Sequence, residues 1–187
     1  MLEIDVAIQG IQTFLKSMGH FDQNDAELEA TAKRVAMTYL HDLCDGYAVE
    51  PGPMIAAQRI RGSTEIVLLR DIYITTLCPH HLLPASGMAT IVFSPNEWIV
   101  GLGAMIRTLE AFAHRLTFQE QIGEQVVEVL MAHLKPYWTA CRLIMRHQCL
   151  ALREATQHQT QVETLAIKGT LSAEERRAIY SLVGLGT

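Results

Sequence analysis

Cysteine is scarce in this chain of 187 residues, which holds only four. Four cysteines are too few for the disulfide framework that stabilises small secreted domains. Charge is scarce as well, since charged residues make up 19% of the chain and the net charge is −5. A chain without a basic excess lacks the means for broad, nonspecific nucleic-acid binding. We therefore expect no nucleic-acid partner.

Long apolar runs and targeting signals are also missing. No segment approaches the roughly 20 apolar residues that span a bilayer. The acidic start, Met1–Asp5, lacks the basic stretch and apolar run of a signal peptide. We expect a cytoplasmic protein with no membrane partner. Thiols stay reduced in that compartment, so cysteines near histidines are expected to bind metal or react rather than pair.

Apolar residues, by contrast, are plentiful. At 49% of the chain they exclude a disordered or low-complexity protein. The length fits one domain at roughly 150 residues per domain. No internal repeat or interdomain linker is visible. Within one continuous domain we distinguish an N-terminal helical region, residues 1–60, from a main region, residues 61–187.

Helical spacing of apolar residues predicts two helices in the N-terminal region. The first ends near Gly19, and the second runs from about Asp25 to Asp45-Gly46. The triplet Pro51-Gly52-Pro53 then predicts a loop. The inward positions are Ile4, Ile8, Ile11 and Leu15 in the first helix, and Leu28, Val35, Tyr39 and Leu43 in the second.

The main region begins with residues typical of strands. β-branched and aliphatic residues over 64–77 predict one strand, and 89–93 predict a second, with a turn at Pro84–Gly87 between them. Two helices follow over 104–116 and 119–134. The fold class is thus α+β: two N-terminal helices, then an antiparallel sheet with helices on one face.

The last part of the chain predicts one more strand and one more helix. The strand covers 140–152 and includes Cys149. Ser172 and Glu175, three residues apart, predict the capping box of a short final helix.

Two short polar motifs stand out against this background: Cys78-Pro79-His80-His81 and His147-Gln148-Cys149. Cys78 and His81, with two residues between them, can close on one ion around a turn, and Cys149 can supply a third ligand. Three protein ligands with an open fourth position are typical of a catalytic zinc site rather than a structural one.

Two further histidines accompany these ligands. If Cys149 faces the metal from a strand, His147 lies on the same strand face. His80 sits beside the ligands, so both histidines are available for proton transfer in a hydrolysis at neutral pH.

The remaining cysteines and histidines are expected to be structural. A lone buried cysteine is usually a small core hydrophobe, and a lone histidine usually packs or lies at the surface. These residues are Cys44, Cys141, His20, His41, His114, His133 and His158.

The segment Leu77–Phe93 resembles the zinc-site segment of GTP cyclohydrolase I, which usually reads Cys-Glu-His-His-Leu-Leu-Pro. Three further segments resemble the family in the same order: Lys33–Ala36, Gly101–Glu120 and Arg146–Cys149. Together the four motifs cover about residues 25–183, and four collinear motifs are more specific than any one.

The resemblance implies a fold, an assembly and a reaction. The fold is the tunnelling fold, with a four-stranded antiparallel sheet in a catalytic region over 61–187. It forms a toroidal homo-oligomer, a pentamer or decamer with active sites at subunit interfaces. Water attacks C8 of a guanine nucleotide, the imidazole ring opens, formate leaves and a dihydropterin forms.

The resemblance also assigns roles to residues. Glu120 has a second interpretation as an acidic residue favoured at a helix start by the dipole. The implied zinc ligands are Cys78, His81 and Cys149; the acid/base pair is His80 and His147; Gln119 and Glu120 contact the guanine edge; Arg34, Arg107 and Arg153 remain for phosphate.

This sequence departs from the family chiefly where the triphosphate binds. Met37 and Ala104 stand where lysines are usual, and Gly103 replaces a serine. Pro79 replaces the glutamate of the zinc motif, and Glu154 follows Arg153 in place of glycine. Charge-assisted contacts contribute roughly 1.5–3 kcal/mol each, so two lost lysines weaken triphosphate binding.

Three hypotheses follow from these observations. The chain is a GTP cyclohydrolase I that tolerates the losses, or a diverged zinc hydrolase of the same fold acting on a purine or pterin without a triphosphate. The third is a non-catalytic, zinc-stabilised homologue. The two histidines outside the ligand set argue against the third, because a structural site needs no spare histidines.

Overall fold

The computed structural model describes residues 4–19, 30–62, 65–154 and 157–184. The chain separates into two compact units, Met1–Asp45 and Gly46–Thr187. Within the described residues, no helix is long and apolar enough to cross a membrane.

The first unit is helical. It contains α1 (Ile4–Ser17), α3 (Thr31–Met37) and a π-helical turn, η1 (Thr38–Leu43). Gly19 adopts a φ of +76°, the left-handed conformation in which a glycine commonly follows a helix end. The predicted apolar positions of α1 are all half-buried, which confirms an amphipathic helix; they are Ile4, Ile8, Ile11 and Leu15.

The second predicted helix is confirmed in its later part. Val35, Tyr39 and Leu43 are half-buried along α3 and η1. Its expected start at Asp25, together with Leu28, lies outside the described residues. A short 3-10 turn, η2 (Asp45–Ala48), follows at the predicted stop.

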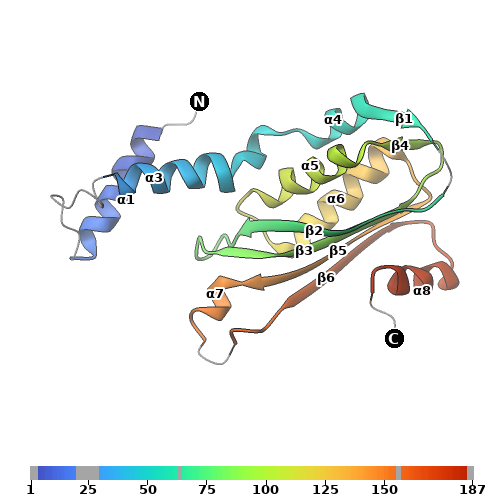
Figure 1. Ribbon diagram of the computed structural model, residues 1–187. Coiled ribbons are helices and arrows are strands. Elements are labelled where there is room, and N and C mark those ends of the chain that lie inside the picture. Colours follow the sequence, from blue (N-terminus) through green and yellow to red (C-terminus); the bar gives the residue numbers. More distant parts are fainter. Residues whose placement is uncertain (1–3, 20–29, 63–64, 155–156, 185–187) are drawn as a thin grey trace. The chain divides into compact units, whose positions relative to one another are not determined.

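A four-stranded antiparallel sheet forms the centre of the second unit (Figure 1). Its order is β2 (Val67–Leu77), β3 (Pro84–Ser94), β5 (Trp138–His147) and β6 (Val162–Gly169). The β2–β3 pair confirms the predicted hairpin. A two-stranded ribbon joins β1 (Arg59–Arg61) to β4 (Trp98–Val100).

One face of the sheet is covered by α4 (Pro51–Gln58), α5 (Leu102–Ala113) and α6 (Gln119–Leu134) (Figure 1). The bounds of α6 are those the sequence predicts. Fully buried side chains from both layers form the main core, each worth about 1.5–3 kcal/mol of burial. They include Ile55, Ile91, Phe93, Leu109, Ile122, Leu130 and Leu143.

The opposite face carries the final helix, α8 (Ala173–Leu182), so the expectation of helices on one face only is wrong. Ile179 and Val183 pack against Val92, Trp138 and Ala140 in a second core. Neighbouring residues of a strand point to opposite faces, so an apolar Val92 beside Ile91 and Phe93 requires cover on both sides.

Hydrogen bonds fix both ends of α8, and the predicted start of this helix is confirmed. The Ser172–Glu175 capping box is present, with both reciprocal bonds made. At the other end, Arg70 of β2 donates to the carbonyl of Leu182, and Arg142 of β5 donates to the carbonyl of Val183. Side chains of two strands therefore hold the end of the helix.

Two predicted turns are wrong. Pro51 opens the helix α4 rather than a loop, because proline is favoured in the first helical turn, where its missing N–H is not needed. Pro84–Gly87 belongs to β3, because proline is tolerated at the first residue of a strand. The hairpin turn instead lies over residues 78–83.

The predicted last strand is too long at its C-terminal end. β5 ends at His147, and Cys149 lies on a short helix, α7 (Gln148–Ala151). The same-face argument for His147 and Cys149 therefore fails. A further strand, β6, was not predicted from the residues; its charged Glu163 and Lys168 are typical of an edge strand.

Candidate metal centre and active site

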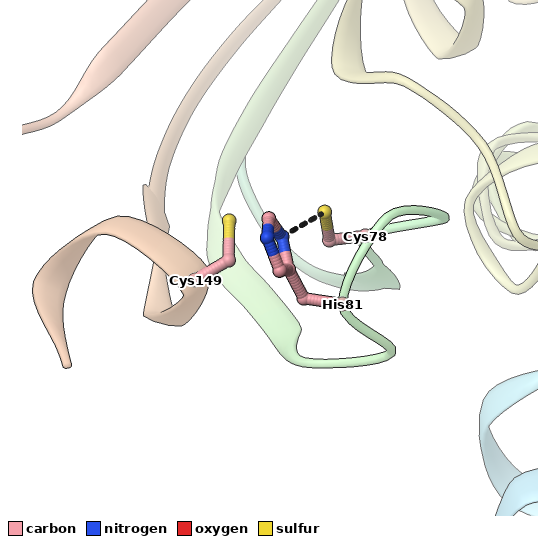
Figure 2. Close-up of side chains that lie close together, drawn as sticks. All are labelled: Cys78, His81 and Cys149. Atoms are coloured by element: carbon pink, nitrogen blue, oxygen red, sulfur yellow. Dashed lines mark hydrogen bonds between the residues drawn. The ribbon is translucent and has the colours of Figure 1, made fainter. Parts of the chain in front are cut away.

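The turn that joins β2 to β3 positions the first two candidate ligands. It is closed by a bond from the Cys78 N–H to the Leu83 carbonyl and another from the Leu82 N–H to the Cys78 carbonyl, both 2.9 Å. The turn brings Cys78 Sγ within 3.7 Å of His81 Nδ1 (Figure 2). This is the approach that the Cys-x-x-His spacing predicts.

Cys149 completes the group from α7. β5 pairs with β3 so that His147 lies opposite Ala85, and the chain then turns into α7 at the same end of the sheet as the 78–83 turn. Ligand atoms of Cys78, His81 and Cys149 all lie within 4.8 Å of one another (Figure 2). A sulfur and a nitrogen bound to one tetrahedral zinc stand roughly 3.6 Å apart, so this donor set fits zinc.

The environment of Cys149 keeps its thiol protonated when no cation is near. Burial, together with the hydrogen bond to Cys78, raises the pKa of Cys149 above its ordinary value of 9.0. The thiolate is the form that binds metal. A divalent cation between the two sulfurs would favour the thiolate and so offset this shift.

Beside the ligands lies a cavity of about 230 Å³. Four predicted site residues that are not metal ligands line it: His80, Gln119, Glu120 and His147. The ring of His80 rests against that of Phe118, with centroids 5.2 Å apart. The structure thus gathers both predicted motifs, and the start of α6, around one cavity.

His147 is half-buried at the end of β5. Its Nε2 lies 2.8 Å from the side-chain oxygen of Gln119. Burial lowers the pKa of His147 below its ordinary value of 6.5, and the negative charge of Glu120 partly opposes that shift. A neutral imidazole at neutral pH is the form that can accept a proton.

Gln119 and Glu120 differ sharply although they are neighbours. Gln119 is 2% exposed and bonds to the protein on every side, whereas Glu120 is exposed at the mouth of the cavity. Glu120 also stands in the first turn of α6. Its position therefore suits both the base contact that the resemblance implies and an acidic residue favoured by the helix dipole.

The three arginines expected at phosphate lie on separate elements. Arg34 belongs to α3 of the first unit. Arg107 on α5 donates to Gln58, at 3.1 Å, and Arg153 Nη1 lies 2.7 Å from His81 Nε2. Among the residues that the structure describes, no lysine or arginine lines the cavity.

The other cysteines and histidines largely behave as expected. Cys141 is fully buried in the main core, and burial raises its pKa to about 12. Cys44 is half-buried, and His114 lies 3.5 Å from the Thr75 hydroxyl. His20 lies outside the described residues; the remaining three are His41 and His158, both exposed, and His133, half-buried.

Some cavity residues lie outside the two polar motifs of the sequence. Thr76, Thr117, Phe118 and Val162 line the cavity but lie outside the polar motifs. Thr117 and Phe118 come directly before α6. The predicted helix start at Gln119 therefore indicates that they lie next to the site residues Gln119 and Glu120. Val162 is the first residue of β6, a strand that the residue pattern does not predict.

Comparison with known proteins decides the family. The family model described as GTP cyclohydrolase I matches residues 7–183. The chain belongs to the GTP cyclohydrolase I family. This confirms the resemblance seen in the four sequence motifs.

Curated relatives agree with this membership of the GTP cyclohydrolase I family. The GTP cyclohydrolase 1 of Campylobacter lari is 32% identical over 178 residues, which cover 94% of this chain and 93% of the relative. That of Campylobacter jejuni serotype O:23/36 is 33% identical, covering 92% of each chain. Among solved structures, the apo archaeosine synthase QueF-Like covers 59% of this chain with a TM-score of 0.49 at 14% identity.

Proposed function

We propose that this chain is a zinc-dependent cyclohydrolase. It would open the imidazole ring of a guanine nucleotide by water attack at C8, release formate and yield a dihydropterin. The observation that carries the proposal is the convergence of Cys78, His81 and Cys149 beside a cavity that also holds two histidines outside the ligand set. Membership of the family supports the same reaction class.

Cys78, His81 and Cys149 would hold the zinc ion. When bound, zinc supplies the Lewis acidity that activates water for attack on a carbon at neutral pH. Three ligands from the chain leave one coordination position for the reaction.

His80 and His147 are proposed as the acid/base pair. His147 is held neutral by burial and so can accept a proton from the attacking water. His80 is exposed in the Cys78–His81 motif and can deliver a proton to a ring nitrogen as the C–N bond breaks. Glu120 would accept hydrogen bonds from the N–H groups of guanine, which suits a carboxylate at the cavity mouth.

We further propose the tunnelling fold and a toroidal homo-oligomer, a pentamer or decamer, with active sites between subunits. The outer edges of β2 and β6 end the four-stranded sheet and are available for pairing. Exposed apolar residues on α1 and directly after it also suit burial against another copy; they are Val6, Phe14 and Met18.

A second candidate is a zinc hydrolase of the same fold that acts on a purine or pterin with fewer phosphates. It is favoured by the cavity lining, which contains no cation among the described residues, and by Arg107 and Arg153 bonding within the chain. Met37 and Ala104, at positions where the family usually has lysine, point the same way. A third candidate, a non-catalytic homologue, leaves His80 and His147 without a role.

A substrate panel separates the candidates. Formate release would be measured from GTP, GDP, GMP and guanosine, with bound zinc determined on the same sample. Fastest turnover of GTP supports the first proposal, and preference for GMP or guanosine supports the second. Stoichiometric zinc with no turnover of any of the four would leave only the third.

A further inference from the structure

Gln119 is the most completely engaged side chain at the site. It is the first residue of α6, and it is 2% exposed. Its amide nitrogen lies 3.1 Å from the Leu143 carbonyl oxygen, 3.0 Å from the Val162 carbonyl oxygen and 3.2 Å from the Thr164 hydroxyl. One side chain thereby joins α6 to both β5 and β6.

These contacts fix which way the amide points. Carbonyl oxygens can only accept hydrogen bonds, so the NH₂ group of Gln119 must face Leu143 and Val162. The amide oxygen then faces the other way, toward His147 Nε2 at 2.8 Å. The reversed amide would set its oxygen against two carbonyl oxygens and leave a buried NH₂ group facing the imidazole.

The orientation of the amide dictates where His147 carries its hydrogen. An amide oxygen accepts but does not donate, so the 2.8 Å contact requires a hydrogen on Nε2 of His147. In the neutral ring, Nδ1 is then the acceptor.

We propose that Gln119 is a positioning residue that holds His147 in the Nε2–H tautomer and does not itself read the substrate base. The proposal rests on the proposed acid/base role of His147. It replaces the base-contacting role expected for Gln119, because both amide hydrogens already have acceptors in the protein. Of these two neighbours, Glu120 is then the one left to accept from the guanine N–H groups.

Two variants at this position separate positioning from packing. Gln119→Met keeps the length of the side chain but removes its polar atoms. Gln119→Glu keeps an oxygen that accepts from His147 Nε2 but places a carboxylate against two carbonyl oxygens. Gln125→Met, on the same helix and away from the cavity lining, is the matched control.

The tautomer is read directly by ¹⁵N NMR of the zinc-loaded full chain, labelled on histidine, at pH 8. The signal of His147 is assigned by its loss in His147→Gln. We expect hydrogen on Nε2 in the wild-type protein and in Gln119→Glu, and a mixture of tautomers in Gln119→Met. Hydrogen on Nδ1 in the wild-type protein would overturn the proposal, whatever the variants do.

Kinetics of formate release give the second readout. Loss of a correctly oriented acid/base group costs about 100-fold or more, so Gln119→Met should lower kcat by about 100-fold with KM within twofold. Gln119→Glu should be the less heat-stable variant yet keep more of kcat, which a packing role alone would not produce. A raised KM with unchanged kcat, or equal losses of kcat in both variants, would contradict positioning.

The two readouts also keep this proposal distinct from the proposed function. If the wild-type protein turns over none of the nucleotides, the proposed function fails while the tautomer measurement still decides the role of Gln119. If turnover is found but His147 carries its hydrogen on Nδ1, the positioning role alone is lost.

Discussion

The three proposed zinc ligands, which we call the zinc corner, differ from the arginines of the second unit in how closely the fold brings them together. Cys78, His81 and Cys149 come from two distant segments and meet within 4.8 Å. Arg107 and Arg153, also from distant segments, each bond to a different partner and do not converge. Among the described residues, the three candidate metal ligands therefore converge within one chain, whereas these two arginines stay apart.

The strongest test of the zinc corner removes a ligand. Cys149→Ser should reduce bound zinc from one ion per chain to near zero and abolish formate release, because a hydroxyl is a poor zinc ligand beside a thiolate. Bound zinc is measured by elemental analysis. Cys44→Ser, a half-buried cysteine outside the group, should keep both zinc and turnover. Full zinc in Cys149→Ser would break the ligand assignment.

A second variant separates chemistry from metal binding within the same corner. His147→Ala should lower formate release by about 10²–10⁴-fold, the usual contribution of an acid/base group. Zinc content should stay at the wild-type level, because His147 is outside the group of three ligands. Loss of zinc in this variant would instead make His147 a ligand.

Zinc uptake should also depend on pH with a defined sign. The raised pKa of Cys149 means that its thiol holds a proton at neutral pH, and zinc must displace that proton. Affinity should therefore rise by at least about tenfold per pH unit between pH 6 and 8, as one displaced proton requires. Competition with a chromogenic chelator measures it, and an affinity flat in pH would contradict a thiolate ligand.

The same pKa shift predicts the behaviour of the zinc-free chain at high pH. The folded form holds the Cys149 proton more tightly than the unfolded form does, so stability declines as pH rises through the ordinary thiol value of 9.0. Buried Cys141, with a pKa of about 12, acts in the same direction and more strongly. Urea unfolding at pH 8 and pH 10 should show a lower midpoint at pH 10, and a smaller drop in Cys141→Ala.

The smallest expected effect concerns the arginines. If Arg107 meets a phosphate in the bound state, Arg107→Ala should raise KM for GTP by about tenfold, the lower end for a charge-assisted contact, and leave guanosine unaffected. Arg177→Ala, which removes one positive charge from α8, is the control. An unchanged KM for GTP would sharpen the contrast with the zinc corner and favour the candidate with fewer phosphates.

The sequence predicts the elements whose local signals are strong. Periodicity places α6 over Gln119–Leu134, the Ser172–Glu175 pair marks the start of α8, and Cys-x-x-His spacing places Cys78 beside His81. Each of these depends on contacts between residues close in sequence. Local patterns can therefore be read without the fold.

The features that were not predicted depend on distant contacts. α7 turns Cys149 out of the strand, and β6 is recognised only by its pairing with β5. The role of Gln119 depends on carbonyls of two strands that lie 24 and 43 residues away. No spacing rule within one segment reports which buried oxygen an amide will face.

The attachment of α8 has a consequence for the order in which the molecule is completed. The four strands and α6 all precede α8 in the chain, so the sheet can form before the helix that covers Val92 and Ala140 has been synthesised. Until Arg70 and Arg142 engage the end of α8, that apolar face stays open to water or to another nascent chain. α8 therefore covers this apolar face only after all four strands have been synthesised.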